Sequence, residues 1–248
     1  MDATVSKRVY IGTSGWSYKH WKEVFYPPGL PASKWLDFYA KHFDSVEVNS
    51  SFYRLPKRET FESWHKKTPQ GFIFAPKASR YITHVKKLKG AEGAWERFFN
   101  NVLGLGEKLG PILFQFPANW QANLERLGSF LTILPSGYKY AFEFRHESWF
   151  TEETYKLLRD GGAALCIADS PLWPTSIVTT ASFTYIRFHG GKVLYASEYS
   201  EPELKKWAGI IERFLSDNIE VYAYFNNDAF GYAVKNAVQL KELLHRTV

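Results

Sequence analysis

Carboxylate and imidazole side chains stand where short apolar runs of this chain end, and they could transfer protons. Glu47 and Glu143 each lie at the end of a β-branched or aromatic run, and His189 follows another such run. Carboxylates and histidine are common general acids and bases in enzymes. Asp169 follows a fourth run and could tune the pKa values of the other three groups. These four residues are the candidate catalytic group.

Cationic and amide side chains close the other runs and favour an anion-binding site. In the segment 187–191, an arginine and a histidine share one parity, and two glycines would let the backbone approach a ligand. A phosphate or a carboxylate would fit there, whereas a plain glycine turn with a capping histidine is the alternative. The polar candidates for substrate binding are Ser14, Asn49, Lys77, Gln115, Arg145, Arg187, Gly190, Asn226 and Asn227.

Aromatic side chains follow several of the same runs. Trp16, Tyr18, Tyr53 and Trp149 could form a wall on which the ring of a sugar or a base stacks. The alternative is that these rings pack loops against the core. We include all four among the candidate substrate-binding residues.

No metal site or cofactor is assigned from the sequence. Glu47, Glu143, Asp169 and His189 are suitable ligand types for magnesium, manganese or zinc. No two of them have close local ligand spacing, so a divalent metal stays an open alternative. The cationic side chains could supply positive charge without a metal. The single cysteine, Cys166, excludes a multi-cysteine metal site.

The elements that must position these residues alternate between strand and helix. Helical stretches are predicted at 33–42, 60–67, 94–109, 124–134, 151–159, 201–215 and 233–245. Strands are predicted at 9–12, 45–48, 72–75, 111–116, 140–144, 163–168, 184–188 and 220–225.

This alternation predicts an α/β fold with parallel strands and right-handed crossovers. Eight such units in 248 residues predict a single domain, 1–248, that forms a (β/α)₈ barrel of the TIM type. The sixth connection, 170–182, is short and holds two prolines, so a loop is expected in place of the sixth helix. An open doubly wound sheet is the runner-up, although the glycine-rich dinucleotide fingerprint is missing.

Side-chain alternation predicts that the polar residues meet at one place. Successive side chains of a strand point to opposite faces, and active sites of this barrel lie at the carboxyl ends of its strands. In the predicted strands the polar residues share one parity and gather at those ends. The alternative is a ring of salt bridges that satisfies itself, such as Glu143 with Arg145 or Asp169 with Arg187.

The charge of the chain is uneven. The formal net charge is +6, yet residues 54–89 hold ten basic and two acidic side chains, so the remainder is slightly acidic. Such a basic segment favours anionic partners, nucleic acid included, and a solvated lysine-rich face is the alternative. No uncharged apolar run of about 18 residues occurs, and residues 1–8 lack the apolar core of a signal peptide. A cytoplasmic protein with no membrane partner is expected.

Seven sequence motifs, spread in order along nearly the whole chain, resemble those of a known family. They are 12–18 (GTSGWSY), 46–49 (VEVN) with Phe52-Tyr53, 72–77 (FIFAPK), 115–117 (QFP), 143–145 (EFR) with Ser148-Trp149, 185–190 (YIRFHG) and 224–228 (YFNND). Together they resemble the domain-of-unknown-function-72 family, also called YecE-like. The resemblance implies a TIM-type barrel and no particular reaction. Ser51 stands where the family often has threonine, so the hydroxyl is kept.

Three functions remain open from the sequence. The first is an enzyme, a hydrolase or isomerase, that applies general acid–base chemistry to a small anionic substrate at the barrel mouth. The second is a nucleic-acid-binding protein or phosphodiesterase that uses the basic segment 54–89. The third is a sensor that binds a small molecule in the same mouth without turnover.

Overall fold

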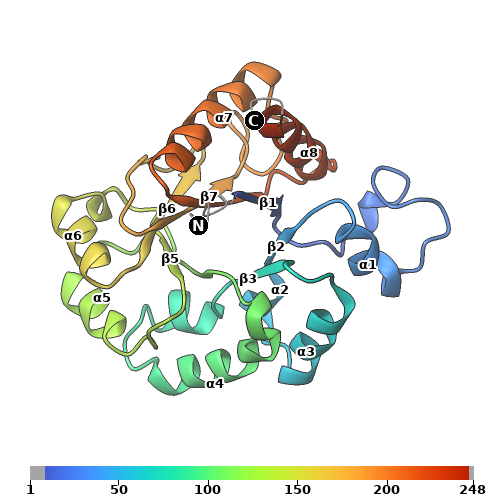
Figure 1. Ribbon diagram of the computed structural model, residues 1–248. Coiled ribbons are helices and arrows are strands. Elements are labelled where there is room, and N and C mark those ends of the chain that lie inside the picture. Colours follow the sequence, from blue (N-terminus) through green and yellow to red (C-terminus); the bar gives the residue numbers. More distant parts are fainter. Residues whose placement is uncertain (1–8, 246–248) are drawn as a thin grey trace, which may run out of the picture.

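The computed structural model describes residues 9–245 (Figure 1). Residues 1–8, from which no signal peptide is expected, and residues 246–248 lie outside that range. Eight strands occur within it, each within two residues of a predicted strand at both ends. They are β1 (Val9–Thr13), β2 (Ser45–Val48), β3 (Ile73–Pro76), β4 (Ile112–Gln115), β5 (Tyr140–Glu143), β6 (Ala164–Asp169), β7 (Phe183–Phe188) and β8 (Glu220–Phe225).

All the paired strands run parallel, which confirms the predicted α/β fold. Six strands form one sheet in the order β1-β8-β7-β6-β5-β4, and β2 pairs with β3. Isolated bridges join Ser14 to Glu47 beside β1 and β2, and join Lys77 to Leu113 beside β3 and β4. At the first junction a Cβ atom on Gly12 would lie 2.1 Å from the carbonyl oxygen of Ser45. Glycine is therefore required for β1 to approach β2.

Helices lie around the outside of the strands (Figure 1). Some of them begin with strong capping signals. Thr151 caps α6 by accepting from the backbone N–H of Thr154, and Ser200 and Glu203 form a capping box at α7. The helices are α1 (Trp35–Tyr39), α2 (Ser50–Tyr53), α3 (Arg58–Lys67), α4 (Glu92–Val102), α5 (Leu124–Leu131), α6 (Glu152–Asp160), α7 (Glu201–Ser216) and α8 (Tyr232–His245).

Two connections show how local chemistry sets the helix limits. The predicted helix 94–109 is instead α4 followed by a 3-10 segment, Leu103–Lys108, in which Gly106 has a φ of 54°. Segment 170–182 forms no helix, as its two prolines predict. It is held to β6 instead, because Thr175 Oγ1 donates to the carbonyl of Ala168 at 2.8 Å and Thr180 Oγ1 to that of Ala163 at 2.7 Å.

Strand parity divides the buried apolar side chains into two clusters. An inner cluster is drawn almost entirely from strands and includes Ala141, Cys166 and Tyr185, whereas an outer cluster packs strands against helices. Glu143 and Arg187 each lie two residues after a member of the inner cluster. On β6, however, Leu165 and Ile167 belong to the outer cluster. Asp169 lies on the same face of the strand as Leu165 and Ile167, so its side chain points toward the helices.

Candidate functional site

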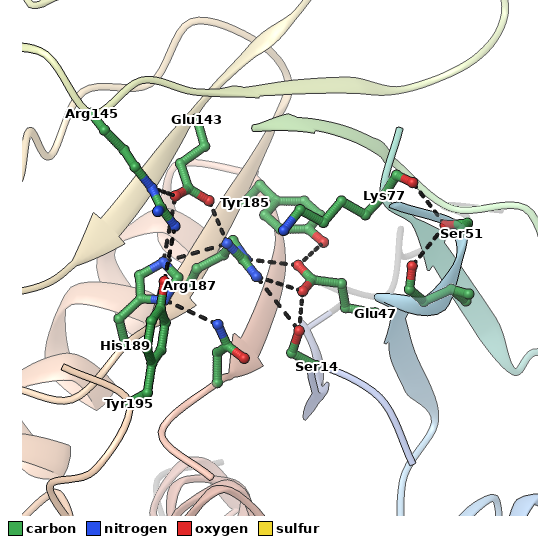
Figure 2. Close-up of polar contacts among 12 residues, drawn as sticks. Ser14, Glu47, Ser51, Lys77, Glu143, Arg145, Tyr185, Arg187, His189 and Tyr195 are labelled. Atoms are coloured by element: carbon green, nitrogen blue, oxygen red, sulfur yellow. Dashed lines mark hydrogen bonds and ion pairs between the residues drawn. The ribbon is translucent and has the colours of Figure 1, made fainter. Parts of the chain in front are cut away.

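Arg187 is the centre of a buried charge network at the carboxyl ends of the strands (Figure 2). Its side chain is 0% exposed. Its Nε and one terminal nitrogen donate to the two oxygens of Glu47 at 2.8 and 2.7 Å, and its other terminal nitrogen donates to Glu143 Oε2 at 2.5 Å. The planar guanidinium matches the carboxylate fork of Glu47, so one cation joins strands β2, β5 and β7.

Glu47 has both oxygens engaged. Ser14 Oγ donates to Oε1, and Tyr185 donates its hydroxyl to Oε2 at 2.8 Å. Burial raises the pKa of Glu47, but the charge and hydrogen bonds of Arg187 outweigh it and leave the pKa below its ordinary value. Glu47 is therefore an ionised anchor at neutral pH.

Glu143 and His189 form the other half of the network. Arg145 Nε donates to Glu143 Oε1 at 2.8 Å, and the arginine charges outweigh burial and hold the pKa of Glu143 well below its usual range. Burial and Arg187 lower the pKa of His189 to about 4, so its ring is neutral at pH 7. Its Nδ1 lies 3.2 Å from the amide nitrogen of Asn226, and its Nε2 lies 3.4 Å from a terminal nitrogen of Arg187 and 3.6 Å from Glu143 Oε1.

A cavity of about 470 Å³, the mouth cavity, adjoins this network. Its wall comes from the carboxyl ends of seven strands and the loops that follow them, where the sequence predicts the site. The lining residues are Tyr18, His20, Asn49, Phe52, Tyr53, Lys77, His84, Gln115, Arg145, Tyr195, Asn226, Asp228 and Ala229.

Lys77 is the unusual member of the wall. Its side chain is only 5% exposed, and its Nζ lies 4.1 Å from the centre of the Phe52 ring. Within residues 9–245 its ammonium makes no hydrogen bond or ion pair, and Figure 2 shows it directed toward Arg187 and Tyr185. Burial lowers the pKa of Lys77, and Arg187 lowers it further, to about 7. The Ser51 hydroxyl supports the strand end by donating to the Lys77 carbonyl at 2.7 Å.

Arg145 brings a permanent positive charge to the same wall. Besides its bond to Glu143, it donates to the Tyr195 hydroxyl at 3.3 Å, and its guanidinium lies 4.0 Å from the centre of the Trp173 ring. The two carboxylates balance the two arginines of the network. Protonated Lys77 adds a positive charge to the wall, and the carboxylate of Asp228, another lining residue, adds a negative one.

The structure brings most of the predicted residues together. Glu47, Glu143, Arg187 and His189 lie in the buried network with Ser14. Those in the cavity wall are Tyr18, Asn49, Tyr53, Lys77, Gln115, Arg145 and Asn226.

Five predicted residues lie elsewhere. Asp169 accepts from Trp207 Nε1 at 3.1 Å on the helix side, because of its outer parity on β6. Trp149 is fully buried and stacks on Phe144 with ring centres 4.2 Å apart, so it packs a loop. The Gly190 amide donates to Tyr199, and the Asn227 amide donates to Ser197 and Asn236. Trp16 lies in a neighbouring pocket.

Several residues of the buried network and the cavity wall were not identified from the sequence. Tyr185 is two residues before Arg187 on the same strand, so its parity could have identified it as a neighbour of Glu47. His84 lies in the short π-helical segment Tyr81–Val85 and Tyr195 in the loop after β7, so no periodicity indicates the direction of either side chain. Burial and Lys77 lower the pKa of His84 to about 4, so it is a neutral group in the wall.

Two features of residues 9–245 concern metal ions and membranes. No three histidine, cysteine or acidic side chains of this range are grouped so as to hold a metal ion. None of the helices in the same range has the length and apolar character needed to cross a membrane.

Comparison with known proteins places the chain among relatives of similar length. The UPF0759 protein YunF of Bacillus subtilis is 30% identical over 273 residues, which cover 95% of this chain and 94% of YunF. The UPF0759 protein YecE of Escherichia coli K12 is 30% identical over 208 residues, covering 73% of this chain and 74% of YecE.

Solved structures agree with this relationship. A DUF72 family protein from Thermotoga maritima superposes with a TM-score of 0.86 at 36% identity, covering 96% of this chain and 99% of that one. A DUF72 family protein from Enterococcus faecalis shares the fold with a TM-score of 0.83 at 21% identity, covering 96% and 95%. A sequence model described as "Protein of unknown function DUF72" matches residues 10–248, so the chain belongs to the DUF72 family, as its motifs indicate.

Proposed function

We propose that the protein is an enzyme that binds a small anionic substrate in the mouth cavity and transfers protons through Lys77. The observation that carries this proposal is the position of the Lys77 amine, which lies in the cavity wall with no hydrogen-bond or ion-pair partner among the described residues. A pKa of about 7 suits a group that gains and loses a proton at neutral pH. The reaction class is hydrolysis or isomerisation.

The network beneath the cavity determines the roles of the other residues in this proposal. Arg145 holds the phosphate or carboxylate of the substrate, because its charge does not depend on pH. Neutral Lys77 takes a proton from water or from a carbon next to a carbonyl group. The ammonium that forms is stabilised by the negative charges of Glu47 and Glu143. These carboxylates therefore act as positioning residues, since arginines occupy their oxygens.

The same proposal includes closure of the eight strands into a barrel. The bridges beside β1 and β2 and beside β3 and β4 support it, because they link the six-stranded sheet to the β2-β3 pair at both ends. In a closed barrel, β3 and β5, which have only β4 between them, could present Lys77 and Arg145 to one bound substrate.

A screen of phosphorylated and carboxylated compounds tests the enzyme proposal. Lys77→Met should abolish turnover of any substrate found, and kcat/KM of the wild type should rise as the pH passes about 7. Lys66→Met is the control, because that exposed lysine lies at the far end of α3. Full turnover by Lys77→Met would refute the role of Lys77, and binding without turnover by the wild type would identify a sensor.

A second candidate function is binding of single-stranded nucleic acid across the mouth. Tyr53, at the end of α2, and Tyr81, in the π-helical segment Tyr81–Val85, are exposed beyond the carboxyl ends of β2 and β3. Lys86 Nζ lies 5.6 Å from the centre of the Tyr81 ring. Exposed rings beside lysines suit base stacking with phosphate contacts. The affinity for a short oligonucleotide across a salt series tests this candidate, and a flat response would refute it.

A further inference from the structure

A second pocket of about 470 Å³ adjoins the mouth cavity. The two hollows share Tyr18, Asn49 and Tyr53 as lining residues, so they form adjoining compartments of one site. The second pocket, here the aromatic pocket, is lined by Gly15, Trp16, Ser17, Tyr18, Asn49, Ser50, Tyr53 and Trp64.

The inner wall of the aromatic pocket is held by the fold. The Trp16 and Trp64 rings meet edge to face with centres 4.9 Å apart, and Trp64 stacks on the buried ring of Phe74. Tyr18 donates its hydroxyl to the Ser14 carbonyl at 2.5 Å. Gly15 has a φ of 99°, and a Cβ there would lie 2.6 Å from that hydroxyl, so glycine is needed for this position of the Tyr18 ring.

Two further features indicate a ligand. The Tyr53 side chain is 76% exposed at the rim, so its ring is open to contact. Asn49 Oδ1 is buried and has no hydrogen-bond partner among the described residues. A buried acceptor without a partner costs free energy, because it has lost its hydrogen bonds to water. A donor such as a ligand N–H group would satisfy this oxygen.

We infer that the aromatic pocket binds the planar base of a nucleotide whose phosphate lies near Lys77 and Arg145 in the mouth cavity. This inference rests on the proposed function and names its substrate class. Four aromatic side chains offer faces or edges to a ring, and Asn49 offers an acceptor for its N–H groups. A sugar ring fits less well, because it needs hydrogen bonds around its whole edge and the remaining polar side chains are Ser17 and Ser50.

Calorimetric titration with three kinds of probe tests the inference. The probes are the nucleoside monophosphates of adenine, guanine, cytosine and uracil, the four corresponding nucleosides, and ribose 5-phosphate. At least one monophosphate should bind roughly tenfold or more tightly than ribose 5-phosphate, as stacking of one base predicts. Lys77→Met should weaken the binding of both the nucleoside monophosphates and ribose 5-phosphate, because both carry a phosphate.

Variants of the aromatic pocket should remove the extra affinity that the base gives to a monophosphate. Tyr53→Ala removes an exposed ring, and Ser50→Trp fills the pocket from an exposed position. Both should reduce the affinity of the monophosphate toward that of ribose 5-phosphate. Ser50 does not line the mouth cavity, so Ser50→Trp should leave the affinity of ribose 5-phosphate unchanged. Phe230→Ala is the matched control, because that ring is 69% exposed outside both pockets.

The outcomes separate the two proposals. If ribose 5-phosphate binds as tightly as all four monophosphates, or if the base advantage survives Ser50→Trp, the aromatic pocket is not a base subsite, although the anion site stands. If a nucleoside binds and Ser50→Trp removes that binding while ribose 5-phosphate does not bind, the subsite stands and the anion site fails. If no probe binds, both proposals are overturned.

Discussion

At the scale of single residues, the site depends on one buried arginine. Arg187 contacts Glu47 and Glu143 from strands that lie far apart in sequence, and it lowers the pKa of Lys77, with which it shares the buried interior. Removal of one member of a buried ion network leaves uncompensated charge in a medium of low polarity. The strongest consequences of mutation are therefore expected here.

Arg187→Met should lower the free energy of unfolding by about 3–5 kcal/mol at pH 7, because it leaves two buried carboxylates without their main partner. Denaturation by urea measures this loss. A triple variant that adds Glu47→Gln and Glu143→Gln should recover part of it, because no unpaired charge then remains. A loss below about 1 kcal/mol in Arg187→Met would show that the network is not a net source of stability.

Lys77 should make stability depend on pH in the alkaline range. Its pKa is about 7 in the folded state and about 10.5 when unfolded, so between these values the unfolded chain binds more protons. The destabilisation caused by this single group is therefore largest below pH 7, and it decreases as the pH rises toward 10.5.

Lys77→Met removes this contribution. The variant should gain most over the wild type at pH 6.5, and its advantage should shrink by up to about 1.4 kcal/mol per pH unit between 7 and 10. Urea denaturation of both proteins at pH 6.5, 8 and 9.5 measures the difference. A constant difference at all three pH values would contradict a lowered pKa.

At the scale of elements, the sequence predicts the strands better than the site around them. Each strand is a short apolar run bounded by turn residues, and its alternation gives the inward direction of Glu47, Lys77, Glu143 and Arg187. The same reasoning is wrong on β6. Nearly every residue of that strand is apolar and buried on both faces, so polarity cannot show which parity points inward, and Asp169 lies on the helix side.

Loops and short helices could not be derived in the same way. The aromatic pocket contains Tyr53 from the four-residue helix α2, which is too short to produce a helical period, and Trp64 from α3. Their meeting with Trp16 depends on how these helices pack beside β2. The adjacency of the mouth cavity and the aromatic pocket therefore depends on tertiary packing, which local sequence patterns do not predict.

Contact between β1 and β2 gives a prediction at this scale. Gly12→Ala should destabilise the fold by several kcal/mol, because the new Cβ would lie 2.1 Å from a backbone carbonyl that cannot easily move. Gly93→Ala is the control, since its Cβ would meet nothing within 4 Å inside α4. That change should stabilise the helix by up to about 1 kcal/mol. Thermal unfolding compares the two, and equal effects would refute the close approach of the strands.

At the scale of the whole molecule, the basic segment 54–89 does not form one patch. Parallel strands with returning helices place the loop after β3 at the mouth end and the last turn of α3 at the opposite end. The mouth end therefore holds Lys86, Lys87 and Lys89. The opposite end holds Lys66 and Lys67, in the last turn of α3. Lys77 is buried in the cavity wall. A single net charge for the segment hides this division.

The division allows the nucleic-acid candidate to be tested without disturbing the cavity. If a single strand crosses the mouth, replacing Lys86, Lys87 and Lys89 together by glutamine should weaken oligonucleotide binding and reduce the log–log salt slope by about two. Replacing Lys66 and Lys67 by glutamine changes net charge in the same direction at the far end, so it should leave the slope nearly unchanged. Equal effects of the two variants would mean that binding follows net charge alone, because a strand held at the mouth contacts only the lysines that lie there.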